Sequence, residues 1–438
     1  MHSIADRRSG RRCDRGHAVL NLSVFPDLLA IGGLVLVFAS LLRRTQQTRL
    51  RYWLVGWVMI LVHIVAQLLY LNLPALDRVG EAVSLSMLLL TSVAFIWAGH
   101  DRRSGWVHGF GWTVLAALPD VAFVVLFAWS VTGRLPFLVL TGLAAGTAMG
   151  LFRSDRRGAR PRERRWVGAT VLLAYAVQAA LVARGQLETA LIWMLCWHYA
   201  LVAYFFWRGA DRATLGVSFT TASFVAWALV FPVAAALDRW LPGLGIQNEA
   251  WNLPKFMVAT GMIFTVLEEQ LGAAKHAALH DPLTGLPNRR LFTQRLDAAL
   301  ARARLEQGSV ALLVIDMDNF KRVNDTRGHA AGDALLSAAA GRLQSRLRVT
   351  DTLARLGGDE FAAILPDPGD TAAVAGQIDR LLRALGRGFD IDGEQVVVQA
   401  SIWAAFFPWD GADEAALLAA ADRAMYARKF DAREQSAG

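Results

Sequence analysis

Carboxylates gather in two short stretches of the C-terminal half of this 438-residue sequence. Asp316 and Asp318 end the apolar run "SVALLVIDMD", and Asp359 and Glu360 follow a Gly-Gly pair in "RLGGDEFAAIL". Asp316 and Asp318 cannot both lie in a protein core without partners, because burying an unpaired charge is costly. The two stretches are therefore the first candidates for chemistry.

If the two stretches lie side by side, Asp316, Asp359 and Glu360 repel one another unless a cation sits between them. Hard oxygen ligands with room for water and phosphate favour Mg²⁺. Carboxylates that share such an ion suit phosphoryl or nucleotidyl transfer. Spacing alone therefore predicts Mg²⁺-dependent phosphate chemistry, and solvated acids at a turn are the alternative.

The elements that must position these acids alternate along the C-terminal half. Strands are expected at 309–317 and 395–406, with a hairpin at 353–365 that turns at the Gly-Gly pair. Helices are expected at 288–306, 331–348, 370–386 and 412–430. This alternation predicts an α/β domain with a mixed sheet flanked by helices, and a site at the end of the first strand.

Three motifs resemble the GGDEF domain of diguanylate cyclases: "DPLTGLPNRRLF", "DMDNFKRVNDTRGHAAGD" and "RLGGDEF". They occur in the family's order and spacing, and the resemblance covers about 279–433. It implies a fold like the nucleotidyl-cyclase and polymerase palm. It also implies that two GTP molecules are joined into cyclic di-GMP with release of two pyrophosphates.

The resemblance assigns metal and catalytic roles residue by residue. Asp316, the backbone carbonyl of Met317 and Asp359 match the ligands of Mg²⁺, for which Mn²⁺ is an alternative. Asp359 also matches the position assigned as proton acceptor, and Glu360 completes the acidic cluster, so both are expected to be catalytic.

The same resemblance assigns substrate contacts. Asn324 and Asp333 match the guanine readers, and a carboxylate there can accept from N1–H and the exocyclic amine together, which adenine does not offer. The other expected contacts with the nucleotide are Phe320, Lys321, His329, Gly357, Gly358, Lys429 and Arg433.

An RxxD pattern, Arg348 to Asp351, lies just before the hairpin, where the family carries its product-inhibition site. A surface ion pair is the alternative reading. Two departures concern Trp403 and Ala432, which stand where relatives usually have glycine. Neither replaces a metal or phosphate ligand, so they affect the expected rate and not the expected class of reaction.

The N-terminal half has a different composition. The chain is 55% hydrophobic and 19% charged. Residues 1–270 carry a net charge of +10 and residues 271–438 a net charge of −2. Apolar runs long enough to cross a bilayer recur. The candidate spans are 26–43, 52–73, 83–99, 110–131, 135–152, 166–184, 188–207, 214–236 and 254–268. A large soluble helical bundle is the alternative.

Arginines concentrate on alternate connections, such as "FRSDRRGARPRERR", which predicts that these loops and the C-terminal half are cytoplasmic. Nine spans then place the N-terminus outside, although the basic leader 1–25 favours the inside. Either one span does not cross or the true start lies downstream. Asp27, Asp120, His63 and His198 fall within spans and are candidate functional groups, or are simply hydrogen-bonded within the bundle.

Phe264, Leu267, Leu271, Ala274 and Ala278 are spaced 3, 4, 3 and 4, as in a coiled-coil seam. The spacing favours a homodimeric linker at 264–280 between a membrane sensor domain at 26–268 and a catalytic domain at 281–438. A short amphipathic helix packed on its own domain is the alternative.

Together with these patterns, the resemblance implies a multi-pass diguanylate cyclase of the bacterial cytoplasmic (inner) membrane, a class of signalling enzyme associated with biofilms. Its catalytic domain would lie in the cytoplasm. The expected partners are GTP, cyclic di-GMP as product and inhibitor, a second copy of the chain and membrane lipid, but no nucleic acid. The alternatives are a non-catalytic receptor for GTP or cyclic di-GMP, and a transporter with an attached regulatory domain.

Overall fold

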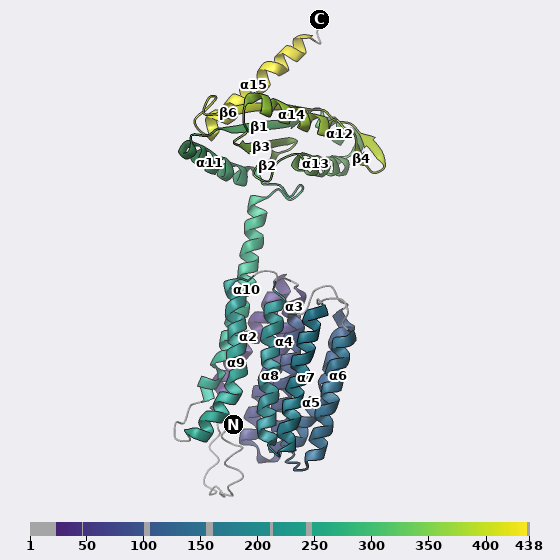
Figure 1. Ribbon diagram of the computed structural model, residues 1–438, viewed down its shortest axis with the longest axis vertical. Helices are drawn as coiled ribbons and strands as arrows, with labels where there is room; N and C mark the ends of the chain where they lie inside the picture. The colour runs from purple at the N-terminus through teal and green to yellow at the C-terminus, as the bar shows by residue number, and fades with distance from the viewer. Residues whose placement is uncertain are drawn as a thin grey trace. The chain divides into compact units, whose positions relative to one another are not determined.

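The computed structural model describes residues 23–45, 47–99, 106–154, 161–210, 213–241 and 248–435. Almost all of the predicted leader 1–25 lies outside these residues. The chain folds as two compact units, Met1–Glu269 and Gln270–Gly438. Figure 1 labels the elements of both units.

The N-terminal unit is helical. Its elements are α2 (Phe25–Thr45), α3 (Thr48–Asn72), the 3-10 helix η1 (Pro74–Leu76), α4 (Asp77–Ala98), α5 (Trp106–Ala128), α6 (Arg134–Ser154), α7 (Pro161–Ala183), α8 (Leu187–Arg208), α9 (Leu215–Trp240) and the first part of α10 (Asn248–Leu279). Each predicted span overlaps one helix from α2 to α10.

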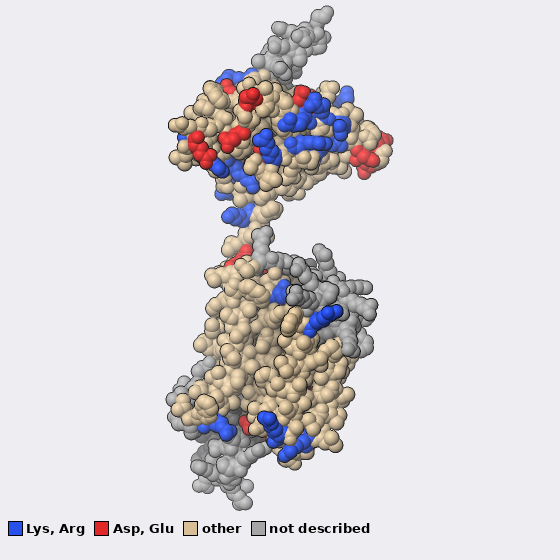
Figure 2. Space-filling view, viewed as in Figure 1, with Lys and Arg blue, Asp and Glu red and all other residues tan. Residues whose placement is uncertain are grey.

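Within the described residues, 6 segments are long and apolar enough to cross a membrane. They are Phe25–Thr45, Thr48–Asn72, Pro74–Ala98, Arg165–Ala183, Leu187–Arg208 and Leu215–Trp240. Figure 2 shows few charged side chains on the visible face of this unit, apart from those near the helix ends. Such a surface fits a hydrocarbon environment.

Aromatic rings fill the core of this helical unit. Phe38 of α2 stacks on Trp57 of α3 at 5.9 Å between ring centroids. Trp57 meets Phe95 of α4 at 5.8 Å, and Phe95 meets Phe224 of α9 at 5.5 Å. Gly56 permits this packing, because a Cβ atom there would lie 2.3 Å from the Phe95 ring. Four helices are thus joined by one aromatic stack.

The C-terminal unit contains a four-stranded sheet in the order β2-β3-β1-β6. Its strands are β1 (Val310–Met317), β2 (Thr352–Gly357), β3 (Glu360–Pro366) and β6 (Ala400–Phe407). The α/β class and the palm-like arrangement of sheet and helices are as predicted. In strand direction the sheet is not mixed, because each of the three pairings is antiparallel. β1 and β2 do run parallel, but β3 lies between them.

Helices cover both faces of this sheet (Figure 1). They are α11 (Arg289–Glu306), α12 (Phe320–Arg327), α13 (His329–Gln344), α14 (Thr371–Leu385) and α15 (Glu414–Gln435). Alternate residues of β1 face opposite sides, as strand geometry requires. Leu313 and Ile315 pack with the α13 and α14 core, and Leu312 and Val314 pack with the α11 and α15 core.

Two elements of this unit were not predicted from the sequence: helix α12, and a separate hairpin of β4 (Phe389–Ile391) and β5 (Glu394–Val396). Trp403 is buried in β6 opposite Val314. Its large side chain therefore lies within the sheet packing and not at the carboxylate end of β1.

Candidate active site

The sheet brings the two carboxylate stretches together. Antiparallel pairing of β1 with β3 sets Asp316 opposite Glu360, and Asp359 immediately precedes Glu360 at the hairpin tip. Asp316 and Asp359 are half-buried, and Glu360 is exposed. Because side chains alternate along a strand, Asp316 and Glu360 project from the same face of the sheet.

The acids near this strand end have different partners. Glu360 is 52% exposed, and its Oε2 lies 3.8 Å from a guanidinium nitrogen of Arg289, the first residue of α11. Asp318 is tied to β6: its N–H donates to the Gln399 carbonyl at 2.9 Å, and Ser401 Oγ donates to its carboxylate at 3.0 Å. Asp318 therefore anchors the end of β1, which leaves Asp316 as the acid nearest the hairpin.

The donor set at this point fits a hard divalent cation. Asp316, Asp359 and the Met317 carbonyl offer oxygen atoms only, and the Met317 side chain is itself buried. Within the described part of the chain, no three His, Cys, Asp or Glu side chains converge as they would in an all-protein metal cage. Two carboxylates and one carbonyl leave coordination positions for phosphate and water, as Mg²⁺ sites usually do.

Asn324 and Gly332 form a second part of the site, beside the sheet. Asn324 lies on α12, and its buried Oδ1 atom has no hydrogen-bond partner in the protein. Gly332 of α13 leaves the space for that side chain, since a Cβ atom there would lie 1.9 Å from Asn324 Oδ1. Gly328, with φ of 83°, makes the turn between the two helices. Asn324 is thus held in place sterically with one acceptor unused.

Apart from Gly357 and Gly358 at the hairpin tip, the remaining predicted substrate contacts lie on the same two helices or on α15. Lys321, His329 and Asp333 are exposed, whereas Phe320, the first residue of α12, is buried. Lys429 and Arg433 belong to α15, but their side chains, like that of Ala432, fall outside the part of the chain that the structure describes.

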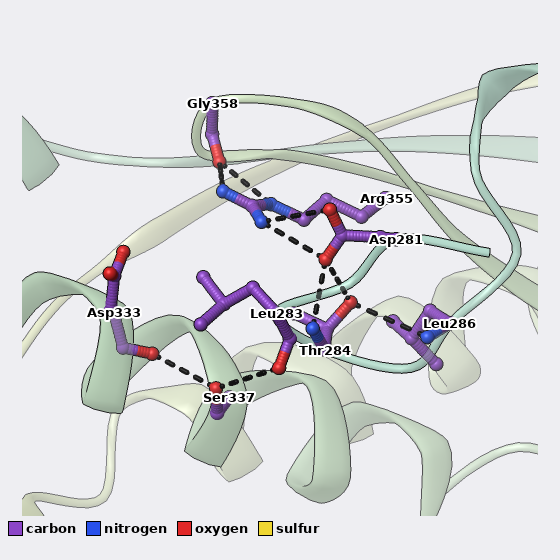
Figure 3. Close-up of polar contacts among 8 residues, drawn as sticks. All are labelled: Asp281, Leu283, Thr284, Leu286, Asp333, Ser337, Arg355 and Gly358. Carbon is purple, nitrogen blue, oxygen red and sulfur yellow. Dashed lines mark hydrogen bonds and ion pairs between the residues drawn. The ribbon is translucent and has the colours of Figure 1, made fainter. Parts of the chain in front are cut away.

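The Gly-Gly tip is held by an arginine that the sequence analysis did not single out. Gly357 and Gly358 adopt φ of 155° and 53°, which favours glycine. Arg355 donates from Nε and Nη2 to the Gly358 carbonyl at 3.0 and 2.7 Å. Its Nη1 donates to both oxygens of Asp281 at 3.0 and 3.1 Å (Figure 3). The guanidinium therefore bridges the hairpin tip and the loop before α11.

Asp281 organises that loop. Its Oδ1 accepts hydrogen bonds from Thr284 N–H at 2.8 Å and Thr284 Oγ1 at 2.7 Å. Burial raises the pKa of Asp281, but the hydrogen bonds from Thr284 and the charge of Arg355 outweigh that effect, so the pKa lies below its usual value. The Asp281 side chain is consequently ionised and paired at neutral pH.

Further contacts attach the loop to the end of α10 and to the core. Asn288 donates from Nδ2 to the Ala278 carbonyl at 2.9 Å and from N–H to the Leu279 carbonyl at 3.0 Å. Leu286 is buried, and Ser337 of α13 donates to the Leu283 carbonyl at 3.2 Å (Figure 3). A hydrogen-bonded path thus runs from the last turn of α10 through Asp281 and Arg355 to Gly358, beside Asp359. The sequence pattern that could have identified this loop is the Asp-x-x-Thr spacing of "DPLT", which suits an Asx turn.

The RxxD residues form a tight turn at a second place on the domain. Asp351 Oδ2 accepts from Arg348 N–H at 2.8 Å, and Asp351 N–H donates to the Arg348 carbonyl at 3.1 Å. The Arg348 side chain is exposed. A small cavity of about 20 Å³ beside this turn is also lined by Gln377 and Arg380 of α14. The sequence analysis missed Arg380, because no local pattern connects α14 with the RxxD turn.

The ionisable residues Asp120, His63 and His198, predicted within spans, have polar partners inside the bundle. Asp120 Oδ2 accepts from Tyr175 Oη at 2.8 Å and lies 3.6 Å from His198 Nε2. His63 Nδ1 lies 2.9 Å from Ser84 Oγ. Each of the two histidines therefore has a polar partner within the bundle.

Comparison with known proteins identifies the C-terminal unit. Residues 278–435 match the family model "Diguanylate cyclase, GGDEF domain". An uncharacterized signaling protein of Caulobacter vibrioides is 42% identical over 160 residues, which are 36% of this chain and 20% of that protein. Diguanylate cyclase TpbB of Pseudomonas aeruginosa is 40% identical over 168 residues, or 38% of this chain and 39% of that protein.

Among solved structures, the GGDEF domain of TpbB from P. aeruginosa is 41% identical to this chain. The match covers 35% of this chain and 89% of the solved chain, with a TM-score of 0.34. The coiled coil and GGDEF domain of DgcB from Caulobacter crescentus, in complex with c-di-GMP, is 28% identical to this chain. That match covers 41% of this chain and 95% of the solved chain, with a TM-score of 0.38.

The chain spans only about a fifth to two fifths of the length of these curated relatives. The family match covers the β1 to β3 pairing, the loop at Asp281, the Gly-Gly tip and the RxxD turn. Residues 278–435, which follow a set of apolar helices, are therefore a GGDEF domain.

Proposed function

We propose that this chain is a membrane-bound diguanylate cyclase that converts two GTP molecules into cyclic di-GMP and two pyrophosphates. The observation that carries the proposal is the pairing of Asp316 with Glu360 across β1 and β3, with Asp359 at the glycine tip of a GGDEF domain. In each of two equivalent steps, the 3′-oxygen of one GTP forms a bond to the α-phosphorus of the other. The bond between that phosphorus and pyrophosphate breaks.

Asp316, Asp359 and the Met317 carbonyl are the groups that would hold a divalent cation, Mg²⁺ or Mn²⁺. When bound, such an ion neutralises triphosphate charge and favours ionisation of the attacking hydroxyl. Asp359 is proposed to accept the 3′-hydroxyl proton, and Glu360 completes the acidic cluster. Arg355 holds the tip through the Gly358 carbonyl, so the backbone of Gly357 and Gly358 can approach the phosphates closely.

Guanine selection is assigned to Asn324 and Asp333. The exposed Asp333 carboxylate can accept from N1–H and the exocyclic amine of guanine. Asn324 Oδ1, buried without a protein partner, adds a second acceptor at a fixed position. Lys321, His329, Lys429 and Arg433 are proposed as further nucleotide contacts. Phe320, the buried first residue of α12, packs in the core and holds that helix in place.

Activity is proposed to require a homodimer, because one domain supplies one GTP and the attacking hydroxyl comes from the other. Exposure of the predicted seam on α10 supports this requirement. Phe264, Leu267 and Leu271 are 36%, 49% and 61% exposed. Apolar side chains repeated in this way on a helix are buried when two copies pair.

Product inhibition is proposed at the RxxD turn. Arginine suits a phosphate or a guanine edge, and Asp351 suits guanine amines. The neighbouring Arg380 adds a second cation beside the same small cavity, and this position supports the assignment.

We place residues 26–268 in the cytoplasmic (inner) membrane of a bacterium, in contact with lipid, as a sensor domain. Residues 264–280 then serve as the linker, and residues 281–438 lie in the cytoplasm. The six apolar segments and the arginines on alternate connections support this arrangement.

The test compares the full-length wild type with two substitutions in lipid nanodiscs supplied with Mg²⁺ and GTP. Asp359→Asn should lower the rate of cyclic di-GMP formation at least a hundredfold, because it removes a metal ligand and the proton acceptor. Asp379→Asn, at an exposed acid of α14 that pairs with Arg383, should leave the rate unchanged. Undiminished activity of Asp359→Asn would overturn the proposal. So would binding of cyclic di-GMP by a wild type that shows no turnover.

A further inference from the structure

A cavity of about 190 Å³ lies inside the helical N-terminal unit, lined by residues from α2, α3, α4, α5, α8, α9 and α10. It is far from the GGDEF motifs in sequence, and no catalytic role involves it. Six acidic or basic side chains line it: Asp27, His63, Glu81, Glu188, Asp238 and Lys255. Ionisable groups within a membrane bundle are costly, so a concentration of them marks a functional site.

Three of these side chains are almost fully buried: Asp27, His63 and Lys255 are 6%, 8% and 9% exposed. Asn252 connects two of them, because its Nδ2 donates to Asp27 Oδ2 at 2.5 Å and its Oδ1 accepts from Lys255 Nζ at 2.6 Å. His63 is fixed by Ser84. Hydrogen bonds to neighbouring residues therefore hold these polar side chains in fixed positions in the cavity wall.

The charge of the lining selects the kind of ligand. Four carboxylates face one lysine, so the cavity repels an anion. Aromatic side chains complete the lining, among them Tyr70, Trp227, Phe231 and Trp251. Carboxylates combined with aromatic faces are the usual recognition elements for organic ammonium ions. A metal ion fits less well, since no three His, Cys, Asp or Glu side chains converge anywhere in the described residues.

The cavity lies at one end of the helical unit. Glu81 lies in the second turn of α4 and Glu188 in the first turn of α8. Asp238 lies in the last turn of α9 and Trp251 in the first turn of α10. The arginine-rich connections join the opposite helix ends. If those connections are cytoplasmic, the cavity opens toward the outer side of the membrane.

The cavity also reaches the helix that leads to the cyclase domain. Trp251, Asn252 and Lys255 all belong to α10, which continues from Lys255 to Leu279 as one helix. Asn288 and Asp281 then bind the end of α10 to the hairpin through Arg355. A ligand that contacts the start of α10 therefore acts on the element that ends at the catalytic domain.

We propose that this cavity binds a small organic cation, an amine or quaternary ammonium ion, from the outer side of the membrane and thereby changes the cyclase rate. The effect on rate rests on the proposed cyclase function. The binding itself does not, and it can be measured without GTP.

The test uses the full-length protein in nanodiscs and isothermal titration calorimetry with tyramine, choline and putrescine. Tyrosol, the uncharged match of tyramine, is the ligand control. We expect at least one cation to bind and tyrosol to bind at least tenfold more weakly. The double substitution Glu188→Gln with Asp238→Asn should weaken cation binding at least tenfold, and both positions are exposed, so folding is not at risk.

Asp77→Asn is the matched protein control, because Asp77 lies one turn before Glu81 on α4 but does not line the cavity. It should bind like the wild type. Failure of all three cations to bind, equal binding of tyrosol, or equal weakening in Asp77→Asn would each overturn the proposal. Binding without any change in rate would reject the regulatory part alone. A full-length wild type that forms no cyclic di-GMP from Mg²⁺ and GTP, with or without the cation, would instead reject the proposed function.

Discussion

At the scale of single residues, identical side-chain types have roles that only their partners reveal. Asp316 and Asp318 are two positions apart, yet it is the Asp318 carboxylate that accepts a hydrogen bond from Ser401 Oγ and the Asp318 N–H that donates to the Gln399 carbonyl. The sequence predicted that the two acids needed partners, and the β1–β3 register explains why Asp316 is the one beside the hairpin. It could not predict the Arg355 bridge, because Asp281 and Arg355 are 74 positions apart.

The Asp281–Arg355 pair makes a prediction about stability. In a fragment of residues 270–438, Asp281→Asn should lower the free energy of unfolding at pH 7 by about 2 kcal/mol, as expected for hydrogen bonds to a charged group. Since folding lowers the pKa of Asp281, its stabilisation is full above the usual carboxyl pKa of 3.8 and disappears as the pH falls through the folded pKa. Urea denaturation across this pH range measures the difference, and a cost independent of pH would contradict the pairing.

The RxxD turn makes a prediction about regulation. Arg348→Ala should raise the concentration of cyclic di-GMP that halves the initial rate at least tenfold, because it removes the exposed guanidinium. Arg346→Ala, two residues earlier and outside the lining of the small cavity, should inhibit like the wild type. Equal inhibition of all three proteins would show that the turn is structural only.

At the scale of elements, long periodic segments were predictable and short ones were not. β1 and α14 match the predicted ranges within one residue at each end. The eight-residue helix α12 is polar and too short for a clear apolar period. The β4–β5 hairpin was missed, although Asp392 and Gly393 at its turn, with φ of 53° and 83°, are the residues that such turns prefer.

The contact between α12 and α13 predicts a selective loss of GTP affinity. Gly332→Ala should displace the Asn324 side chain while the domain still folds, since the atom that must move ends a flexible side chain. We expect the KM for GTP to rise about tenfold, equivalent to one lost hydrogen bond.

Gly341→Ala on the same helix is the control for Gly332→Ala. A Cβ atom at Gly341 meets nothing within 4 Å, so KM should not change and stability should rise by up to about 1 kcal/mol. Steady-state kinetics and denaturation of both variants decide the matter. An unchanged KM in Gly332→Ala would remove Asn324 from the site.

The seam of α10 predicts a dependence of activity on dimerisation. Leu271→Asp should reduce the dimer fraction and lower the specific activity at least tenfold, because a charge replaces an apolar residue of the seam. Ala273→Asp, off the seam on the same turn of α10, should leave both unchanged. Light scattering and initial rates over a range of protein concentrations provide the measurement, and a fully active monomer would refute the requirement.

At the scale of the whole molecule, composition predicted the division into an apolar helical unit and an α/β unit. The helical unit was predictable in outline, because its apolar runs have the length that a helix needs to cross a bilayer. Its cavity was not, since Asp27, Glu81, Glu188 and Lys255 come from four helices that no sequence pattern relates. The residues that line the cavity could be identified only from the packing of the helices.

The central claim is that the GGDEF domain of this chain joins two molecules of GTP. The most direct measurement is mass-spectrometric quantification of the products that the full-length wild type forms from Mg²⁺ and GTP. We predict cyclic di-GMP together with two pyrophosphates for each molecule formed, and no cyclic product from ATP. GTP that is bound but not converted, or hydrolysed without a cyclic product, would contradict the claim.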